Sequence, residues 1–172
     1  FMKEKLWEPT RDRVKKSNLK DFSKFINFGK NENFKDLWLW SINEPEKFWS
    51  NFWDFSKIIG DKGKKIIQKE KFFNRTKFFP DSKINYTENI IKKKTDEIAI
   101  SFLSENKLED KISWKDLYAK VCKFSNYLKS LNLKKGDRVA AYVPNKIESI
   151  ISFLACAKNG VIWSSCSPDF GT

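Results

Sequence analysis

Residues 138–166 read RVAAYVPNKIESIISFLACAKNGVIWSSC, and this stretch has the pattern of a strand, a helix and a second strand. Its first six residues are mostly apolar and end at Pro144, which cannot donate to a strand ladder. Apolar side chains then recur at three- and four-residue steps up to the helix stop signal Asn159-Gly160. The last six residues give a second short strand. The pattern predicts a parallel βαβ unit with a right-handed crossover.

Two parallel strands do not make a stable sheet, because such a sheet must be covered on both faces. We therefore expect further strands beyond Thr172. The chain begins with Phe1 ahead of Met2 and stops at Gly171-Thr172, so we expect both ends to be cut points in a longer protein.

A hairpin and a long helix are expected before this unit. Residues 97–103 alternate or run apolar and can pair with residues 111–113. Ser113 and Asp116 resemble a capping box, with Asp in place of the usual Glu. The helix that they open carries a regular apolar stripe up to Leu131. The fold class predicted for this part is α/β.

The first half of the chain is predicted to be mainly helical. A helix is expected to begin after Ser17 and to end near Gly29, and a second short amphipathic segment follows around residues 34–40. A third helix is expected from Pro45, with five large aromatic residues on its surface. Such a stripe favours a core face over a platform for stacking bases. Residues 60–83 are rich in lysine and are expected to form short extended pieces and turns.

The domain boundary is expected after residue 94, where the charge balance changes. Residues 1–94 hold 23 Lys+Arg against 13 Asp+Glu, whereas residues 95–172 hold 11 against 9. The whole chain carries a net charge of +12. The excess is nearly all lysine and accompanies abundant Asn, Ile and Phe, as codons rich in adenine and thymine would produce. We therefore favour a solvated lysine surface, although a nucleic-acid-binding module remains an alternative.

Composition excludes several kinds of chemistry. With no histidine, a histidine-dependent triad or an imidazole metal site within this chain is excluded. Cys122, Cys156 and Cys166 form no C-x-x-C pair, so a reducing cytoplasm is expected rather than a disulfide framework. The longest apolar stretch is far shorter than the ~20 residues of a spanning helix, and no signal or transit peptide is recognisable.

Several short strings carry a family resemblance. The most specific is WSSCSPDFG at residues 163–171, preceded by ACAKNGVI at residues 155–162. Together they resemble acetoacetyl-CoA synthetases (acetoacetate–CoA ligases), within the adenylate-forming acyl-CoA synthetase superfamily. Other strings agree with that superfamily in the same order, namely WLWS (38–41), PEKFW (45–49), NYTENI (85–90), ISWKDL (112–117) and GDRV (136–139).

The resemblance implies both an architecture and an activity. Residues 1–94 would form the N-terminal region shared with acetyl-CoA synthetases, and residues 95–172 the incomplete start of an AMP-binding domain. The implied enzyme is a ligase of lipid and ketone-body metabolism that uses acetoacetate, ATP, CoA and Mg²⁺. Small molecules are then its expected partners, rather than nucleic acid or a membrane. An acetyl- or propionyl-CoA synthetase-like ligase for another short acid is the nearest alternative.

The resemblance assigns one candidate site to this chain. Ser167, Pro168 and Asp169 form the turn after the last strand, and by resemblance they would lie near CoA. The family's phosphate-binding loop ending in lysine is absent from this sequence and is expected downstream, with the other catalytic groups. We therefore assign no catalytic residue and no metal ligand here, and we expect this chain alone to be inactive.

Overall fold

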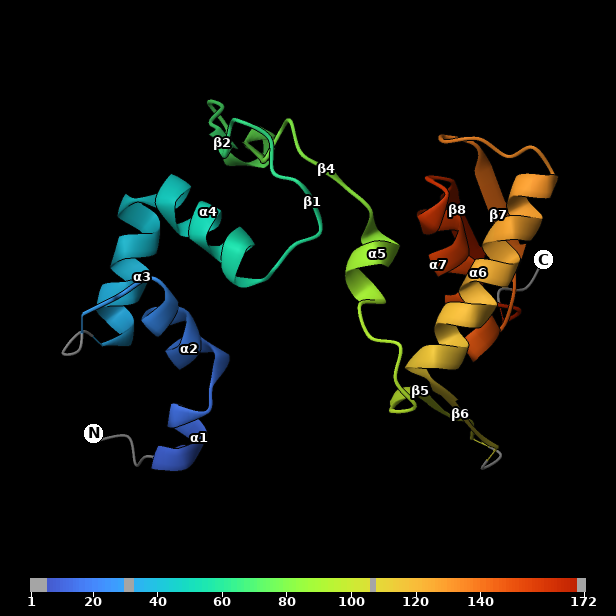
Figure 1. Cartoon of the computed structure of the whole chain (residues 1–172), viewed down its shortest axis with the longest axis horizontal. Helices are drawn as coiled ribbons and strands as arrows, with labels where there is room; N and C mark the ends of the chain where they lie inside the picture. Colours follow the sequence, from blue (N-terminus) through green and yellow to red (C-terminus); the bar gives the residue numbers. More distant parts are fainter. Residues whose placement is uncertain (1–5, 30–32, 106–107, 170–172) are drawn as a thin grey trace. The chain divides into compact units, whose positions relative to one another are not determined.

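The computed structural model describes residues 6–29, 33–105 and 108–169 (Figure 1). By its internal contacts the chain divides into two compact units, residues 1–83 and residues 84–172. The first unit is mainly helical, whereas the second combines helices with strands. This order agrees with the expected helical region followed by the first elements of an α/β domain.

The first unit contains the predicted helices and several two-residue strands. The strands β2 and β3 pair antiparallel, with Ile67 opposite Phe78. The short pieces agree with the extended segments and turns expected over residues 60–83. The elements are α1 (Arg11–Lys15), α2 (Asn18–Phe25), α3 (Phe34–Asn43), α4 (Pro45–Phe55), β1 (Gly60–Asp61), β2 (Ile67–Gln68), the 3-10 turn η1 (Phe73–Arg75), β3 (Lys77–Phe78) and, at the junction of the units, β4 (Lys83–Ile84).

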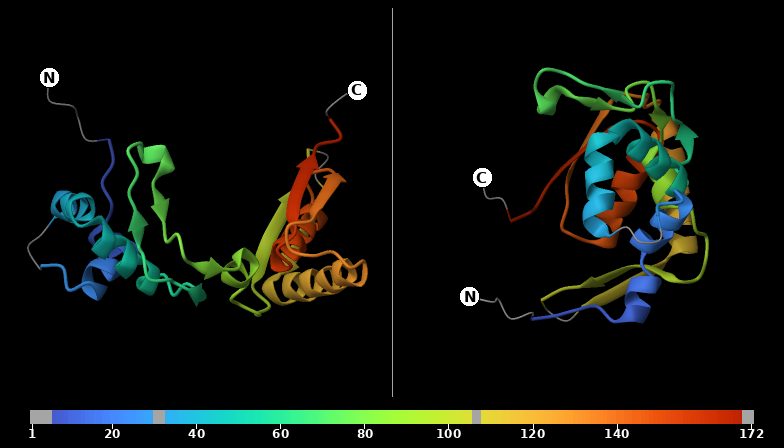
Figure 2. Two further views of the ribbon diagram at one scale, coloured as in Figure 1. Left: turned by 90° about the horizontal axis from the view of Figure 1, so that it is seen from above. Right: turned by 90° about the vertical axis from the view of Figure 1, so that its left-hand side faces the viewer.

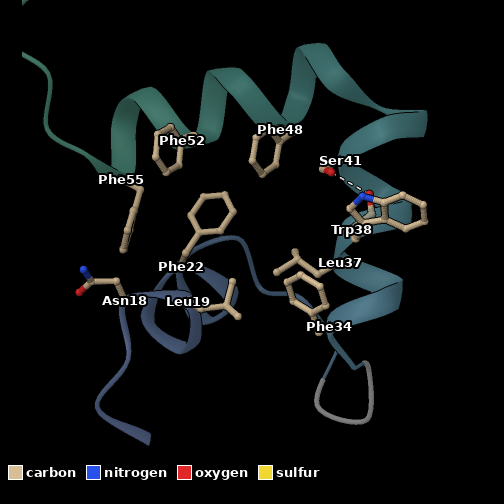
Figure 3. Close-up of a pocket in the computed structure, with 10 residues that line it drawn as sticks. All are labelled: Asn18, Leu19, Phe22, Phe34, Leu37, Trp38, Ser41, Phe48, Phe52 and Phe55. Atoms are coloured by element: carbon tan, nitrogen blue, oxygen red, sulfur yellow. Dashed lines mark hydrogen bonds between the residues drawn. The ribbon is translucent and has the colours of Figure 1, made fainter. Parts of the chain in front are cut away.

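Aromatic rings hold α2 against α4. Phe22 of α2 is only 4% exposed, and its ring meets those of Phe48, Phe52 and Phe55 edge-on, at centroid distances of 5.8, 5.9 and 5.2 Å (Figure 3). Edge-on packing is favourable because the positive edge of one ring meets the negative face of another. The aromatic stripe of α4 therefore does form a core face, although Phe52 remains 42% exposed.

The end of α2 differs from the sequence-based expectation. The helix ends at Phe25, and Asn27, rather than Gly29, adopts the left-handed backbone conformation with φ of 53°. Its N–H donates to the Lys24 carbonyl oxygen at 3.1 Å, and the next N–H donates to the Ser23 carbonyl oxygen at 2.9 Å. These two backbone hydrogen bonds form a Schellman motif, in which asparagine is the usual substitute for glycine. The prediction of a stop at Gly29 was therefore wrong.

The second unit has the predicted strand–helix–strand order. The strands β5 and β6 pair antiparallel as the expected hairpin, and β7 and β8 run parallel (Figure 2). Tyr142 pairs with Cys166 at the end of the parallel ladder. Helix α7 connects the parallel strands. The elements are α5 (Tyr86–Ile90), β5 (Ile98–Leu103), β6 (Glu109–Ser113), α6 (Trp114–Ser130), β7 (Arg138–Tyr142), α7 (Ile147–Lys158) and β8 (Ile162–Cys166).

The core of the second unit lies where α6 packs against α7. Leu117 and Val121 of α6 and Ala155 and Cys156 of α7 are almost entirely buried. Small residues on α7 let the two helices approach closely, because they leave little side chain between the backbones. Only half of the expected capping box forms at the start of α6: Ser113 Oγ accepts from the Asp116 N–H at 3.1 Å, whereas the Asp116 carboxylate accepts from the Ser113 hydroxyl at 2.8 Å. The apolar stripe in the sequence therefore identified this core correctly.

Helix α5 is tied to α7 by two polar side chains. Asn85 Nδ2 donates to the carbonyl oxygens of Ala157 and Lys158, each at 3.1 Å. The buried Thr87 hydroxyl donates to the Leu154 carbonyl oxygen at 2.7 Å. The compact second unit therefore includes α5. The boundary expected after residue 94 separates the N-terminal region of the family from its AMP-binding domain, which is a different division from that into compact units. It stays a prediction.

Candidate functional site

The carboxyl ends of β7 and β8 meet at one edge of the second unit. Because the strands are parallel and in register, both end at the pair Tyr142 and Cys166. The Val143 N–H extends the ladder by donating to the Cys166 carbonyl oxygen at 3.2 Å. Ligands of open parallel sheets bind outside the carboxyl ends of the strands. This edge is therefore the place in the described chain where a ligand is most expected.

The three candidate residues lie together in the turn that leaves β8. The Ser167 hydroxyl donates to the Asp169 carboxylate at 2.9 Å, and its oxygen accepts from the Asp169 N–H at 3.2 Å. Such short side-chain bonds to the backbone stabilise turns. The expected continuation of the turn through Phe170 and Gly171 lies outside the described residues.

Tyr142 is the residue of this edge that the sequence analysis missed. Its hydroxyl donates to the Pro168 carbonyl oxygen at 2.8 Å, which joins the end of β7 to the turn after β8. The side chain is 63% exposed, so burial does not explain its presence on the strand. A signal was available, because Tyr142 stands two positions before Pro144, near the end of the expected strand, where its hydroxyl lies at the carboxyl edge of the sheet.

One face of the β7–β8 pair is open next to this turn. Val139 and Trp163 pack against the helical core, so side chains at alternating positions point the other way. An open hollow of about 300 Å³ lies along the strands. Small and polar side chains surround most of it, and its lining residues are Ala140, Ala141, Tyr142, Ser164, Ser165 and Cys166.

The chemistry of the edge is that of binding rather than of bond breaking. It offers hydroxyls, a carboxylate and an exposed thiol, that of Cys166. Burial raises the pKa of the Cys156 thiol in α7, which therefore stays protonated in the core. Over residues 6–29, 33–105 and 108–169, no cluster of three or more His, Cys, Asp or Glu could hold a metal ion. No helix within those same ranges is long and apolar enough to cross a membrane.

Comparisons with known proteins place this architecture in a family. The acetoacetyl-coenzyme A synthetase of Rhizobium meliloti (strain 1021) is 36% identical over 172 residues, which cover 96% of this chain and 26% of that protein. The acetyl-coenzyme A synthetase of Desulfatibacillum aliphaticivorans is also 36% identical, over 148 residues that cover 75% of this chain and 21% of that protein. This chain thus spans about a quarter of the length of the curated relatives that it matches.

A solved structure shares the fold. The acetoacetyl-CoA synthetase from Streptomyces lividans aligns with a TM-score of 0.85 at 24% identity, over 98% of this chain and 27% of that one. The AMP-binding enzyme family matches residues 87–172, which begin in α5 and include the whole βαβ unit. The resemblance inferred from the short sequence strings is thereby confirmed, and the chain belongs to the AMP-binding enzyme family.

Proposed function

We propose that the whole protein is an acid–thiol ligase that converts acetoacetate, ATP and CoA into acetoacetyl-CoA, AMP and pyrophosphate. The observation that carries the proposal is the 36% identity with an acetoacetyl-CoA synthetase along 96% of this chain. The sequence string at residues 163–171, which begins within β8 and which the resemblance assigns to acetoacetyl-CoA synthetases, supports the same choice.

The proposed reaction has two steps. A carboxylate oxygen of acetoacetate attacks the α-phosphorus of ATP, a P–O bond breaks, and pyrophosphate leaves the acyl-adenylate. The CoA sulfur then attacks the acyl carbon, its proton is released, and the C–O bond to AMP breaks. Adenylation makes the reaction possible because AMP is a far better leaving group than the oxygen of a free carboxylate.

We assign the turn Ser167–Pro168–Asp169 to the side of the site that receives CoA. The turn follows the carboxyl end of a parallel strand, which is the usual ligand position in such sheets. Ser167 and Asp169 bond to each other, so the turn has its own shape before any ligand arrives. A preformed turn loses less conformational entropy on binding than a loose one.

The ATP-binding and catalytic groups are proposed to lie outside this chain. ATP chemistry of this kind uses Mg²⁺ to neutralise phosphate charge. The described residues hold no cluster for a metal ion, and the sequence has no glycine-rich loop ending in lysine. We therefore expect no ATP–pyrophosphate exchange from the 172-residue chain alone.

The proposed setting is a reducing cytoplasm, with small molecules rather than nucleic acid or a membrane surface as partners. Three free thiols, one of them exposed, support a reducing compartment. The excess of lysine over arginine argues against a phosphate-reading surface, since arginine is preferred for bidentate recognition.

A ligase for another short acid is the second candidate, because an acetyl-coenzyme A synthetase matches with the same identity over less of the chain. The deciding experiment is a panel of acetoacetate, acetate, propionate and butyrate, given to the whole protein with ATP and CoA. The proposal expects the highest kcat/KM for acetoacetate. A higher kcat/KM for acetate or propionate would move the assignment to that acid. A reaction without CoA is the control, because it measures ATP consumption that is not coupled to the formation of acyl-CoA.

A further inference from the structure

We propose that Tyr142 is a positioning residue for CoA, and that it acts by fixing the turn after β8 through its hydroxyl. The inference rests on the proposed function, because it assigns a role at the same edge of the sheet. It adds a residue of β7 to the candidate CoA site, which the sequence analysis confined to the turn after β8.

The contact joins two segments that are far apart in the sequence. Tyr142 is the last residue of β7, and it lies opposite Cys166, the last residue of β8. Two residues beyond Cys166, the Pro168 carbonyl oxygen accepts the tyrosine hydroxyl at 2.8 Å. The aromatic side chain thus extends beyond the last pair of the β7–β8 ladder and contacts the turn that follows β8.

The contact adds a second restraint to the turn, beside the bonds between Ser167 and Asp169. The ring of Pro168 fixes its own φ near about −65°, but the orientation of its carbonyl group depends on ψ. Proline also has no N–H, so this residue cannot donate a hydrogen bond to a neighbouring strand. A hydroxyl bound to the Pro168 carbonyl oxygen sets that remaining angle, and with it the direction of the next peptide N–H.

That next N–H belongs to Asp169, whose position is also fixed from the other side. It donates to Ser167 Oγ at 3.2 Å, while the Asp169 carboxylate accepts from the same hydroxyl at 2.9 Å. Tyr142 therefore anchors the middle of a turn whose two flanking residues bind each other. Without the hydroxyl the turn keeps its internal bonds but loses its connection to β7.

Removal of the Tyr142 hydroxyl is expected to leave the fold intact. Tyr142 is 63% exposed, so its removal opens no cavity in the core, and phenylalanine fits the same strand position. A neutral hydrogen bond contributes a modest net free energy, so the loss is expected to change ligand affinity by about three- to tenfold. The change should affect only the substrate that meets the turn.

The test is the Tyr142→Phe variant of the whole protein, with acetoacetate as the acid. We expect KM for CoA to rise about three- to tenfold while KM for ATP stays within about twofold. Hydrogen–deuterium exchange of the peptide containing Ser167 and Asp169 should become faster in the same variant. Tyr127→Phe, which removes the hydroxyl of an exposed tyrosine on α6, is the matched control and should change neither quantity.

The outcomes separate this inference from the proposed function. An unchanged KM for CoA in Tyr142→Phe would overturn the positioning role while acetoacetyl-CoA formation still stood. An equal rise in KM for ATP would also overturn it, because a general structural defect would then be responsible. If the unsubstituted protein forms no acyl-CoA from any acid of the panel, the proposed function itself is wrong. Faster exchange confined to the turn would support the anchoring contact independently of activity.

Discussion

Ser125 of α6 and Asn159 at the end of α7 exchange two hydrogen bonds. The Ser125 hydroxyl donates to Asn159 Oδ1 at 2.8 Å, and Asn159 Nδ2 donates to the Ser125 carbonyl oxygen at 2.9 Å. Ser125 is completely buried in the helix interface. The pair fixes the point where α7 ends and Gly160, with φ of 71°, turns the chain into β8.

Substitution Ser125→Ala should therefore destabilise the second unit. It leaves Asn159 Oδ1 without its donor in a partly buried place, which lowers the free energy of unfolding by about 1–3 kcal/mol. Urea denaturation followed by tryptophan fluorescence measures the change. Ser130→Ala is the control, because that exposed hydroxyl bonds only within its own helix, and its effect should stay within about 0.5 kcal/mol. Equal effects of the two substitutions would contradict the role of the pair.

Substitution Phe22→Ala should have the largest effect in the first unit. The ring contacts three rings of α4, and its loss leaves a cavity that rigid helices fill only partly (Figure 3). Phenylalanine-to-alanine changes in cores lower the free energy of unfolding by about 3–5 kcal/mol. Phe73→Ala is the control because Phe73 is 81% exposed, and it should change stability little. Near-ultraviolet circular dichroism during thermal unfolding would detect the difference, and similar midpoints for both variants would be inconsistent with the aromatic core.

Asn85 has two separate roles, and two substitutions distinguish them. Its Oδ1 accepts from the Glu88 N–H at 3.2 Å as the cap of α5, while its Nδ2 binds two carbonyl oxygens at the end of α7. Asn85→Ser keeps a capping oxygen but removes the contacts to α7, whereas Asn85→Ala removes both. Alanine should lower the free energy of unfolding by about 1–2 kcal/mol, and serine by less. The same loss in both variants would show that capping contributes nothing.

The three thiols should react in the order of their exposure. A thiol reagent should modify Cys166 first and Cys156 only after unfolding, since Cys166 is exposed and Cys156 is completely buried. Burial also raises the pKa of Cys156 in the folded state, so the unfolded chain loses that proton at a lower pH. The associated stability is present below about pH 8.5 and falls as the pH rises through the folded pKa. Early labelling of Cys156 at neutral pH would contradict this arrangement.

Much of the fold could be predicted because periodicity reports which face of an element is buried. The stripe through Leu117 and Val121 identified α6 and its core face, and the apolar runs around Pro144 and Gly160 identified the parallel strands. Helix ends were harder to predict. Asn27 and Lys57 adopt the left-handed conformation that usually indicates glycine, so a glycine-based stop signal missed both positions.

The contacts that connect distant segments could not be predicted from one sequence. Asn85 reads locally as a helix cap, and nothing around it indicates a partner more than 70 residues away at the end of α7. Tyr142 likewise reads as an ordinary strand residue until the register of β7 and β8 places it beside the turn. The turn itself was predicted from its sequence string, but its connection to β7 required the structure.

In the proposed reaction, the whole protein activates acetoacetate as an acyl-adenylate and then transfers the acyl group to CoA. Acetoacetate labelled with oxygen-18 in its carboxylate distinguishes this route from others. We expect mass spectrometry to find acetoacetyl-CoA together with AMP that carries one labelled oxygen, because the attacking carboxylate oxygen stays on the phosphorus when the C–O bond breaks. AMP without the label, or formation of ADP and labelled phosphate instead, would show that no acyl-adenylate forms.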